Sequence, residues 1–281
     1  MDSGRRWYRM DSIDFTNKVV IVTGGASGIG QATAREFAER HAAVAIFDRN
    51  DQGGAETASA LRGAGHTAEY FHVDLAVSAE VERAVEQVVA RMGGVDILAN
   101  VAGIQRYGTA VTTSDAEWDE TQNANVRSAF LASKYAIPHM VRRGGGAIVI
   151  VGSVQSMTAQ RNSMAYVVSK HALLGLTRSM ALDFAADNIR VNCICPGAID
   201  TPMLRWAASL DEHPERVVDA CHKLSMFGRM GRAEEIARVI AFLASDMASY
   251  ISGSAIVADG GLLTPTGGML SQESGTGGAR K

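Results

Sequence analysis

Cysteine, proline and aromatic residues are scarce in this chain of 281 residues. It contains three cysteines, five prolines and 6% aromatic residues. Three cysteines, at positions Cys193, Cys195 and Cys221, cannot all pair in disulfides, and a Cys-x-Cys spacing without a nearby histidine pattern is not a zinc site. We therefore expect buried free thiols and no bound metal.

The chain also lacks an excess of positive charge and any long apolar run. Lysine and arginine number 27 against 30 aspartates and glutamates, which gives a net charge of −3 and disfavours a nucleic-acid partner. No stretch approaches the roughly 18 apolar residues of a membrane helix, and the start of the chain lacks the apolar core of a signal peptide. We expect a cytoplasmic protein that engages neither nucleic acid nor membrane.

Short apolar runs alternate with segments of helical periodicity along most of the chain. Hydrophobic residues make up 47% and charged residues 20%, as in ordinary globular proteins. Fully apolar, β-branched runs indicate strands that are covered on both faces. The sequence predicts strands at Lys18–Thr23, Ala43–Phe47, Ala68–Val73, Val95–Ala99, Ala147–Val151, Ile189–Cys195 and Ser254–Ala258. It predicts helices at Ile29–Arg40, Asp51–Ala64, Ser78–Arg91, Glu117–Val141, Ala165–Ala186 and Ala233–Ala244.

This alternation predicts an α/β fold: one Rossmann-like, doubly wound parallel β-sheet with helices on both faces. We expect a single domain at residues 16–265. Residues 1–15 form an N-terminal extension in this interpretation. Residues 266–281 are small, polar and glycine-rich, which is typical of a flexible tail.

A glycine-rich loop joins the first predicted strand to the first predicted helix. It reads Thr-Gly-Gly-Ala-Ser-Gly-Ile-Gly from position 23, with the spaced glycines at Gly24, Gly28 and Gly30. A helix N-terminus at the carboxyl end of a strand offers free N–H groups and a favourable dipole to a pyrophosphate. Without a ligand the same glycines are a tight turn. The Gly-x-x-x-Gly-x-Gly spacing resembles the cofactor loop of the short-chain dehydrogenase/reductase family, and the resemblance implies that Ser27 and Ile29 also contact the cofactor.

The second predicted strand is followed by Asp48, 18 residues after Gly30. An acid at this place accepts hydrogen bonds from the ribose hydroxyls of an adenosine and repels a 2′-phosphate. In the family, members that prefer NADP usually carry a basic residue where this chain has Ser27. We therefore expect NAD as the cofactor, although Arg49 beside Asp48 offers a guanidinium that a phosphate can use.

Tyr166 and Lys170 are four residues apart at the start of a predicted helix, so they lie on one face. A neighbouring ammonium stabilises a phenolate and lowers the tyrosine pKa, although this pair also suits an ordinary exposed helix. Ser153 ends the fifth strand, 13 residues before Tyr166. This spacing is similar to the catalytic serine, tyrosine and lysine of the same family, and the resemblance adds Asn125 as a fourth catalytic residue.

Further motifs extend the resemblance from residue 18 to about residue 262. Asp74 and Leu75 resemble the family's adenine contact. The segment from Asn100 to Gly103 resembles its Asn-Asn-Ala-Gly motif, with Val101 in the second place. The segment from Pro196 to Thr201 resembles the segment beside the nicotinamide. The resemblance implies the cofactor contacts Asn100, Ala102, Gly103, Pro196, Gly197, Ile199 and Thr201, with Tyr166 and Lys170 also touching the cofactor.

The resemblance implies an oxidoreductase that interconverts a secondary alcohol and a ketone. Tyr166 acts as the acid or base, Ser153 donates a hydrogen bond to the substrate oxygen, and Lys170 lowers the tyrosine pKa and holds the nicotinamide ribose. Asn125 positions a water for proton relay, whereas Asn100 is structural and ties neighbouring strands together.

The loops after the fourth, fifth and sixth strands carry candidate substrate contacts: Arg106, Gln155, Arg161 and Trp206. Because arginine binds carboxylates bidentately, we expect a small polar alcohol, a sugar or a sugar acid. Solvated arginines, or arginines paired with acids, are the alternative.

Two other functions remain open from sequence. An NADPH-dependent ketone or 3-oxoacyl reductase shares these motifs, and a non-catalytic dinucleotide-sensing scaffold shares the fold. Members of the family commonly form tetramers. Apolar residues on more than one face of the two long helices, such as Phe130 and Leu174, are consistent with this, so we expect a homotetramer.

Overall fold

The computed structural model describes residues 13–264. The expected C-terminal tail lies outside the described residues, as does most of the expected N-terminal extension. Within residues 13–264 no helix is long and apolar enough to cross a membrane, and no cluster of histidine, cysteine and acidic residues suits a metal ion. Cys193 and Cys195 are buried free thiols, as expected, whereas Cys221 is only half-buried.

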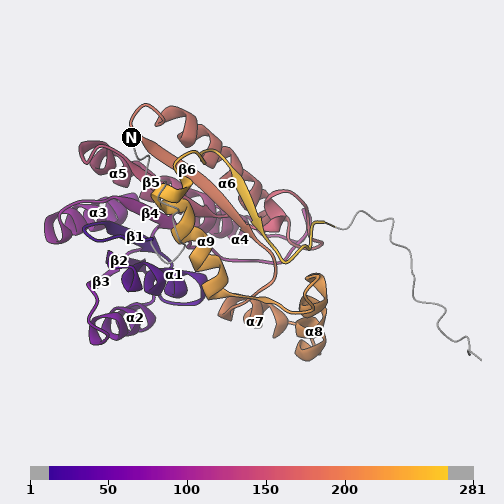
Figure 1. The fold of residues 1–281 in the computed structure, drawn as a ribbon. Helices are drawn as coiled ribbons and strands as arrows, with labels where there is room; N and C mark the ends of the chain where they lie inside the picture. Colours follow the sequence, from indigo (N-terminus) through magenta and orange to yellow (C-terminus); the bar gives the residue numbers. More distant parts are fainter. Residues whose placement is uncertain (1–12, 265–281) are drawn as a thin grey trace, which may run out of the picture.

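Seven parallel strands form one sheet in the order β3-β2-β1-β4-β5-β6-β9 (Figure 1). The chain builds outward from β1 to β3 and then restarts beside β1 with β4, so this is the doubly wound sheet that the sequence predicts. A separate pair of two-residue strands, β7 and β8, lies between β6 and β9 in the sequence. The strands are β1 (Val19–Thr23), β2 (Ala43–Asp48), β3 (Ala68–His72), β4 (Ile97–Asn100), β5 (Gly146–Val151), β6 (Ile189–Pro196), β7 (Ile199–Asp200), β8 (Gly231–Arg232) and β9 (Ala255–Ala258).

Two helical layers cover the sheet. One layer contains α1, α2 and α9, and the other contains α3, α5 and α6. The helices are α1 (Gly28–Glu39), α2 (Asp51–Gly63), α3 (Ser78–Met92), α4 (Asp115–Gln122), α5 (Ser128–Arg142), α6 (Met164–Asp183), α7 (Pro202–Ala208), α8 (Pro214–Leu224) and α9 (Ala233–Ala244). Because both faces of the sheet are covered, the central strands are mostly apolar, and every residue of β1 is buried.

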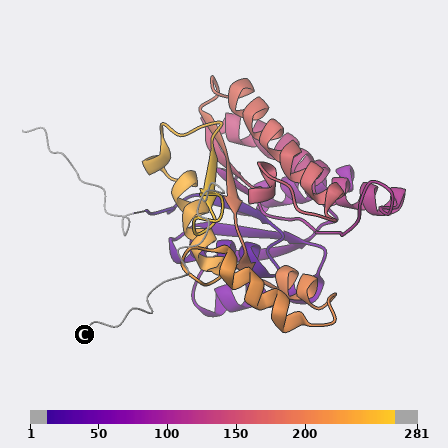
Figure 2. The same cartoon turned by 90° about the vertical axis from the view of Figure 1, so that its right-hand side faces the viewer.

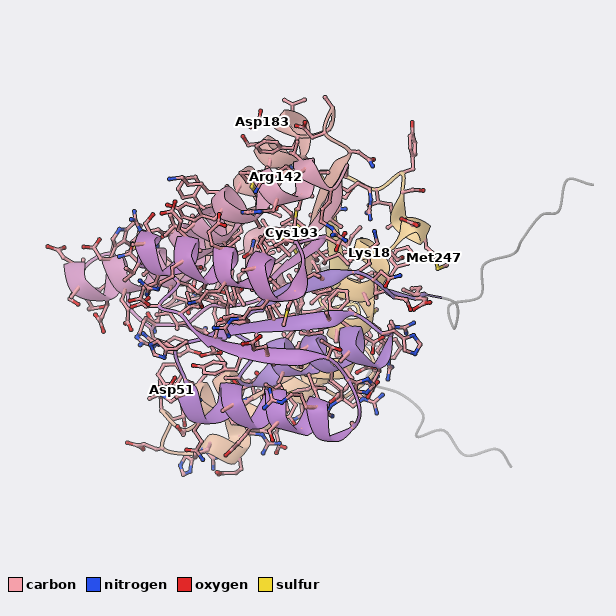
Figure 3. All side chains as sticks on the ribbon, turned by 90° about the vertical axis from the view of Figure 1, so that its left-hand side faces the viewer. Lys18, Asp51, Arg142, Asp183, Cys193 and Met247 are labelled. Carbon is pink, nitrogen blue, oxygen red and sulfur yellow. The ribbon has the colours of Figure 1, made fainter. Side chains whose placement is uncertain are left out.

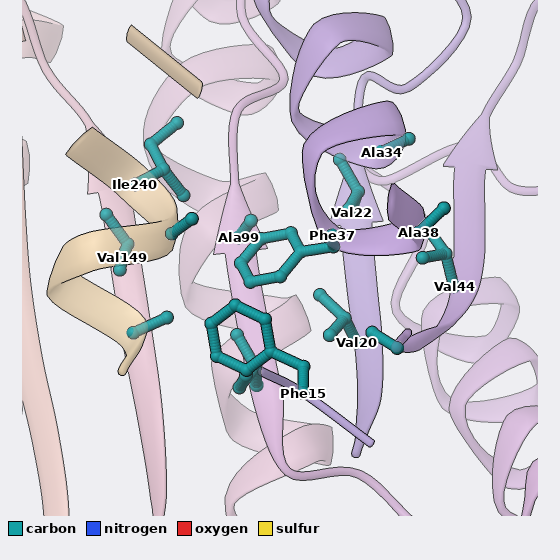
Figure 4. Close-up of a cluster of buried hydrophobic side chains, with 14 of the residues drawn as sticks. Phe15, Val20, Val22, Ala34, Phe37, Ala38, Val44, Ala99, Val149 and Ile240 are labelled. Carbon is teal, nitrogen blue, oxygen red and sulfur yellow. The ribbon is translucent and has the colours of Figure 1, made fainter. Parts of the chain in front are cut away.

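The core between the sheet and the α1/α9 layer is shown in Figure 4. Phe37 of α1 and Ile240 of α9 pack over Val20 of β1 and Val149 of β5. Phe15 precedes β1, and its ring centroid lies 4.9 Å from that of Phe37. The folded core therefore includes Phe15, a residue that we assign from sequence to the N-terminal extension.

The expected helix over residues 117–141 is not one continuous α-helix. The structure has α4, a five-residue π-helical turn at Asn123–Arg127, and then α5. Helix α4 begins at a capping box in which Ser114 and Glu117 satisfy each other's backbone N–H groups. A π-turn inserts one extra residue and so rotates the rest of the helix about its axis, which places Asn125 inward and buried.

Helices α7 and α8 are not expected from sequence, which predicts only a loop after the sixth strand. They lie outside the two helical layers, at the carboxyl ends of the strands (Figures 1 and 2). Helix α8 contains no fully buried residue, so it belongs to neither helical layer of the core. Prolines at the first helical position, Pro202 and Pro214, are the local signals that mark both starts.

Helix α1 approaches β1 closely because two glycines face each other. A β-carbon on Gly30 would collide with the carbonyl oxygen of Gly24, whereas a β-carbon on Gly63, at the end of α2, would meet no atom within 4 Å. We predict that Gly30→Ala destabilises the fold by about 3 kcal/mol, whereas Gly63→Ala stabilises it by about 0.5–1 kcal/mol. Chemical denaturation measures both. Equal effects of the two substitutions would contradict the close approach.

Candidate active site

A cleft of about 980 Å³ opens at the carboxyl ends of the strands, between the glycine loop, the two helical layers and helices α7 and α8. Ligands of doubly wound sheets bind at this edge, where the strand order reverses. Most predicted site residues line this cleft: Gly24, Ser27, Gly28, Ile29, Gly30, Asp48, Asp74, Leu75, Ala102, Gly103, Ser153, Gln155, Tyr166, Lys170, Pro196, Gly197, Ile199 and Thr201.

The glycine loop exposes the N-terminus of α1 to the cleft. Gly24 and Gly28 have φ values of +70° and +54°, a backbone conformation that favours glycine. Ser27 is the N-cap residue but makes no side-chain capping bond, and the first turn contains no acid. The first N–H groups of the helix and its dipole are therefore available to an anion, as a dinucleotide pyrophosphate requires.

Asp48 fixes the loop from the neighbouring strand. Its carboxylate accepts hydrogen bonds from the backbone N–H of Ala26, at 3.0 Å, and of Asn50, also at 3.0 Å. The side chain is half-buried and lines the cleft, next to the exposed Arg49. Carboxylate oxygens have lone pairs beyond these two bonds, so Asp48 can still accept from ribose hydroxyls.

Ser153, Tyr166 and Lys170 come together in the cleft, and all three are buried. Ser153 follows β5 and caps a short 3₁₀ turn at Val154–Ser156, where its hydroxyl accepts from the Gln155 N–H at 3.2 Å. The Lys170 Nζ lies 5.4 Å from the centroid of the Tyr166 ring and donates a 2.9 Å hydrogen bond to the carbonyl oxygen of Val151.

Burial dominates the acid–base properties of this trio. It raises the pKa of Tyr166 to about 12, against a lowering by the Ser153 hydrogen bond, and it lowers the pKa of Lys170 to about 8. From sequence we expect the lysine to depress the tyrosine pKa. The pKa of Tyr166 is instead raised, because desolvation of the phenolate outweighs the lowering by the Ser153 hydrogen bond.

Asn125 does not line the cleft but lies directly behind it. Its Nδ2 donates to the Ile104 carbonyl oxygen and to Ser169 Oγ, both at 2.9 Å, and its Oδ1 accepts from the Ile104 N–H at 2.7 Å. A β-carbon on Gly103 would lie 3.1 Å from this Oδ1 and 3.6 Å from Lys170 Nζ. Both amide protons of Asn125 are thus occupied, and only Oδ1 retains a lone pair.

Asn100 is structural, but not in the way that we expect from sequence. Its Nδ2 donates 3.2 Å to Ser133 Oγ of α5, so it ties β4 to a helix rather than to another strand. The tie between strands comes from Thr23, whose hydroxyl accepts from the N–H groups of Val101 and Ala102 at 3.0 and 3.1 Å. These bonds hold the loop after β4 against the end of β1.

The four candidate substrate residues lie in different places. Only Gln155 lines the cleft, and its Nε2 donates to Gln160, also at the cleft. Arg161 is exposed and is not among the lining residues. The Arg106 guanidinium makes two 2.9 Å hydrogen bonds to the Glu120 carboxylate and lies 5.7 Å from the Trp206 ring centroid, so its charge is already paired.

Several lining residues are not identified from sequence. Tyr107 lines the cleft and stacks on Trp206, with ring centroids 6.4 Å apart. Glu120 of α4 lines it too, and Val217, Cys221 and Leu224 contribute from α8. The last three recur at helical spacing, and this is the signal in the sequence that marks one apolar face of α8.

Comparisons with known proteins agree with this geometry. A family model described as enoyl-(acyl carrier protein) reductase matches residues 24–263. The cis-4-hydroxycyclohexanecarboxylate dehydrogenase of Sinomonas cyclohexanicum is 40% identical over 248 residues, which are 88% of this chain and 97% of that protein.

Two solved structures share the fold along nearly their whole length. The aldohexose dehydrogenase of Thermoplasma acidophilum, in ligand-free form, has a TM-score of 0.83 at 35% identity, covering 92% of this chain and 98% of its own. A gluconate 5-dehydrogenase from Burkholderia cenocepacia, in complex with NADP and tartrate, has a TM-score of 0.85 at 32% identity, covering 92% of this chain and 100% of its own.

Burying the Lys170 ammonium costs stability in a pH-dependent way. Its pKa falls from 10.5 to about 8 on folding, so between these values the unfolded chain binds more protons than the folded protein. The contribution of Lys170 to the free energy of unfolding therefore rises with pH across this window, by about 3 kcal/mol in total.

We predict that the free energy of unfolding of Lys170→Met, relative to that of the wild type, is highest below pH 8. This relative value declines as the pH rises toward 10.5. Urea denaturation at a series of pH values measures this difference. The lost hydrogen bond to Val151 shifts the difference by a constant amount, so a difference that is independent of pH would contradict the prediction.

Proposed function

The chain belongs to the short-chain dehydrogenase/reductase family of oxidoreductases, and from this we propose that it is an NAD-dependent dehydrogenase that interconverts a secondary alcohol and the corresponding ketone. The observation that carries the proposal is the buried trio Ser153, Tyr166 and Lys170, gathered at the cleft next to the exposed N-terminus of α1. A dinucleotide site and a proton donor with a hydrogen-bonding partner then share one cavity.

The residues that line the cleft have the chemistry to bind a dinucleotide. Gly24, Gly28 and Gly30 line the cleft at the start of α1, whose first N–H groups have no side-chain cap, and Asp48 offers acceptors for ribose hydroxyls. All residues from Pro196 to Thr201 except Asp200 also line the cleft. When bound, NAD supplies the hydride acceptor for oxidation of the carbinol carbon.

The protein's own residues handle the proton. Tyr166 Oη takes the hydroxyl proton of the alcohol during oxidation and returns it during reduction. With its pKa near 12 the phenol is protonated at neutral pH, so reduction starts with the proton in place. Ser153 is the second hydroxyl that can hydrogen-bond the substrate oxygen, and the Lys170 Nζ lies 5.4 Å from the centroid of the Tyr166 ring.

Asp48 supports NAD over NADP. A carboxylate that already accepts two backbone hydrogen bonds stays in place, and it repels the 2′-phosphate of NADP. The gluconate 5-dehydrogenase neighbour holds NADP, so a related chain of this fold binds the phosphorylated cofactor. Arg49 lines the cleft beside Asp48 and is the observation that favours the second candidate function, an NADPH-dependent ketone or 3-oxoacyl reductase.

The lining of the substrate end supports a neutral polar alcohol or a sugar rather than a sugar acid. Gln105, Gln155 and Gln160 offer carboxamides, and Tyr107 offers a phenol. Arg106 is paired with Glu120 and does not line the cleft, so no guanidinium near Tyr166 in the described residues is placed to bind a substrate carboxylate.

Apolar side chains on the outer faces of α5 and α6 support a homotetramer. Phe130 and Val168 are 46% and 41% exposed, and Leu182 is 81% exposed. Exposed apolar side chains on adjacent helices are typical of subunit contacts.

We predict that Tyr166→Phe reduces kcat for alcohol oxidation by at least about 1,000-fold while the Kd for NADH stays within about twofold, because only the proton-transferring hydroxyl is lost. Initial rates are measured on a panel of polyols, sugars, sugar acids, hydroxy acids and simple alcohols, with NAD and with NADP. Tyr135→Phe is the matched control, since that hydroxyl pairs with Ser78 away from the cleft.

Each outcome of this experiment discriminates between functions. Turnover by the wild type with NADP alone would overturn the NAD proposal in favour of the reductase. NADH binding without turnover of any alcohol or ketone would favour a dinucleotide-sensing scaffold, and retained turnover in Tyr166→Phe would remove the tyrosine from the mechanism.

We predict a solution mass of four times the chain mass of 29.8 kDa, and a smaller mass for the double variant Phe130→Arg/Leu182→Arg, because buried charges are costly at an apolar interface. Light scattering measures both. Val111→Arg is the control, since Val111 is 93% exposed in the loop before α4. A monomeric wild type would refute the tetramer.

A further inference from the structure

The turn between β2 and α2, residues 48–51, is held from two sides. On one side the Asp48 carboxylate accepts from Ala26 of the glycine loop, at 3.0 Å. On the other side the Asp48 carbonyl oxygen accepts from the Val73 N–H and from the Tyr70 hydroxyl, both at 3.0 Å. Asp48 therefore links the cofactor loop to β3, and Tyr70 is the side chain at that link.

The Tyr70 hydroxyl reaches a second residue of the same turn. It lies 2.8 Å from Asp51 Oδ1, and His72 Nδ1 lies 2.8 Å from that same oxygen. Asp51 is the first residue of α2 and is well exposed (Figure 3). A hydroxyl has one proton, so this proton is shared between the Asp48 carbonyl and the Asp51 carboxylate, and it holds the two ends of the turn together.

The ring of Tyr70 is built into its place. The parallel register pairs Tyr70 with Ile46 of β2, two residues before Asp48. A β-carbon on Gly54 would collide with the Tyr70 ring, so α2 can lie over the ring only because residue 54 is glycine. Packing against α2 therefore fixes the orientation of the ring and directs its hydroxyl at the turn.

The turn has little room on its other side. A β-carbon on Gly53, in the first turn of α2, would lie 2.9 Å from the carbonyl oxygen of Ala26. The start of α2 therefore abuts the glycine loop, and a displacement of residues 48–51 also changes the position of the Asp48 carboxylate relative to that loop.

We propose that Tyr70 is a positioning residue for cofactor selection: its hydroxyl fixes the turn so that the Asp48 carboxylate, rather than the neighbouring Arg49 guanidinium, meets the adenosine ribose. The proposal rests on the proposed NAD-dependent function. Tyr70 does not line the cleft, whereas Asp48 and Arg49 both do, so Tyr70 acts through Asp48 and not by touching the cofactor.

Removing only the hydroxyl leaves the surrounding structure supported. In Tyr70→Phe the ring still fills the space under α2, the Val73 N–H still donates to the Asp48 carbonyl, and His72 still pairs with Asp51. The turn loses the side-chain hydroxyl that contacts both Asp48 and Asp51. A hydrogen bond to a charged acceptor is stronger than a neutral one, so its loss is measurable in binding.

The test measures the Kd values of NADH and NADPH by nicotinamide fluorescence for the wild type, Tyr70→Phe and Tyr135→Phe. For Tyr70→Phe we expect the Kd of NADH to rise about fivefold, equivalent to about 1 kcal/mol, while the Kd of NADPH stays within twofold, so the preference for NADH narrows. The KM for NAD rises in parallel and kcat stays within twofold. Asp51→Asn, at an exposed site, shifts the preference in the same direction by about twofold.

Tyr135→Phe removes a comparable hydroxyl, 2.8 Å from Ser78 Oγ, and leaves both Kd values unchanged. An unchanged ratio of the two Kd values in Tyr70→Phe, with the thermal midpoint preserved, would overturn the positioning role while leaving the proposed function intact. An equal loss of affinity for NADH and NADPH would also overturn it, because a general loosening of the fold would weaken the binding of both dinucleotides alike. A wild type that binds neither dinucleotide would refute both proposals.

Discussion

The close contact between the Gly24 carbonyl and the Gly30 α-carbon is the constraint on which the rest of the cleft depends. No side chain fits between the start of α1 and the end of β1, so the helix begins directly at the sheet edge and its N–H groups face the cleft. A helix that began one residue farther away would bring its dipole to solvent instead of to a bound anion. The backbone thus places the anion site, and side chains only refine it.

Burial determines the acid–base state of the proposed catalytic residues in the cleft, as close packing determines the conformation of the glycine loop. Tyr166 and Lys170 are both buried, and desolvation shifts both pKa values toward the neutral form. Lys170 is kept in place by the Val151 carbonyl, and the Ser153 hydroxyl opposes the rise in the Tyr166 pKa without cancelling it. The arrangement favours a protonated tyrosine in water-poor surroundings, which is the state that a proton donor to a ketone needs.

The sequence predicts those parts of the structure that depend on local pattern. Buried parallel strands are apolar over four to eight residues, so the sheet and the glycine loop at Gly24 to Gly30 are evident from the chain itself. Spacing along one helix predicts that Tyr166 and Lys170 lie together. What the pattern does not contain is the pairing of distant polar groups. Arg106 looks like a free cation in sequence, and only the fold reveals that Glu120, 14 residues away, neutralises it.

Helix α8 and the π-turn around Asn125 escape prediction for a related reason. Helix α8 has no fully buried residue, so its pattern reflects contact with a cleft rather than with a core. The π-turn arises because Asn125 must reach both the Ile104 backbone and Ser169, and those partners belong to a loop and to another helix. Residues whose conformation is set by partners on other elements therefore concentrate at the cleft, where Asp48 in turn depends on a tyrosine of β3. The cofactor end of the site is consequently determined by β3 as much as by the glycine loop, although β3 contributes no residue to the wall of the cleft.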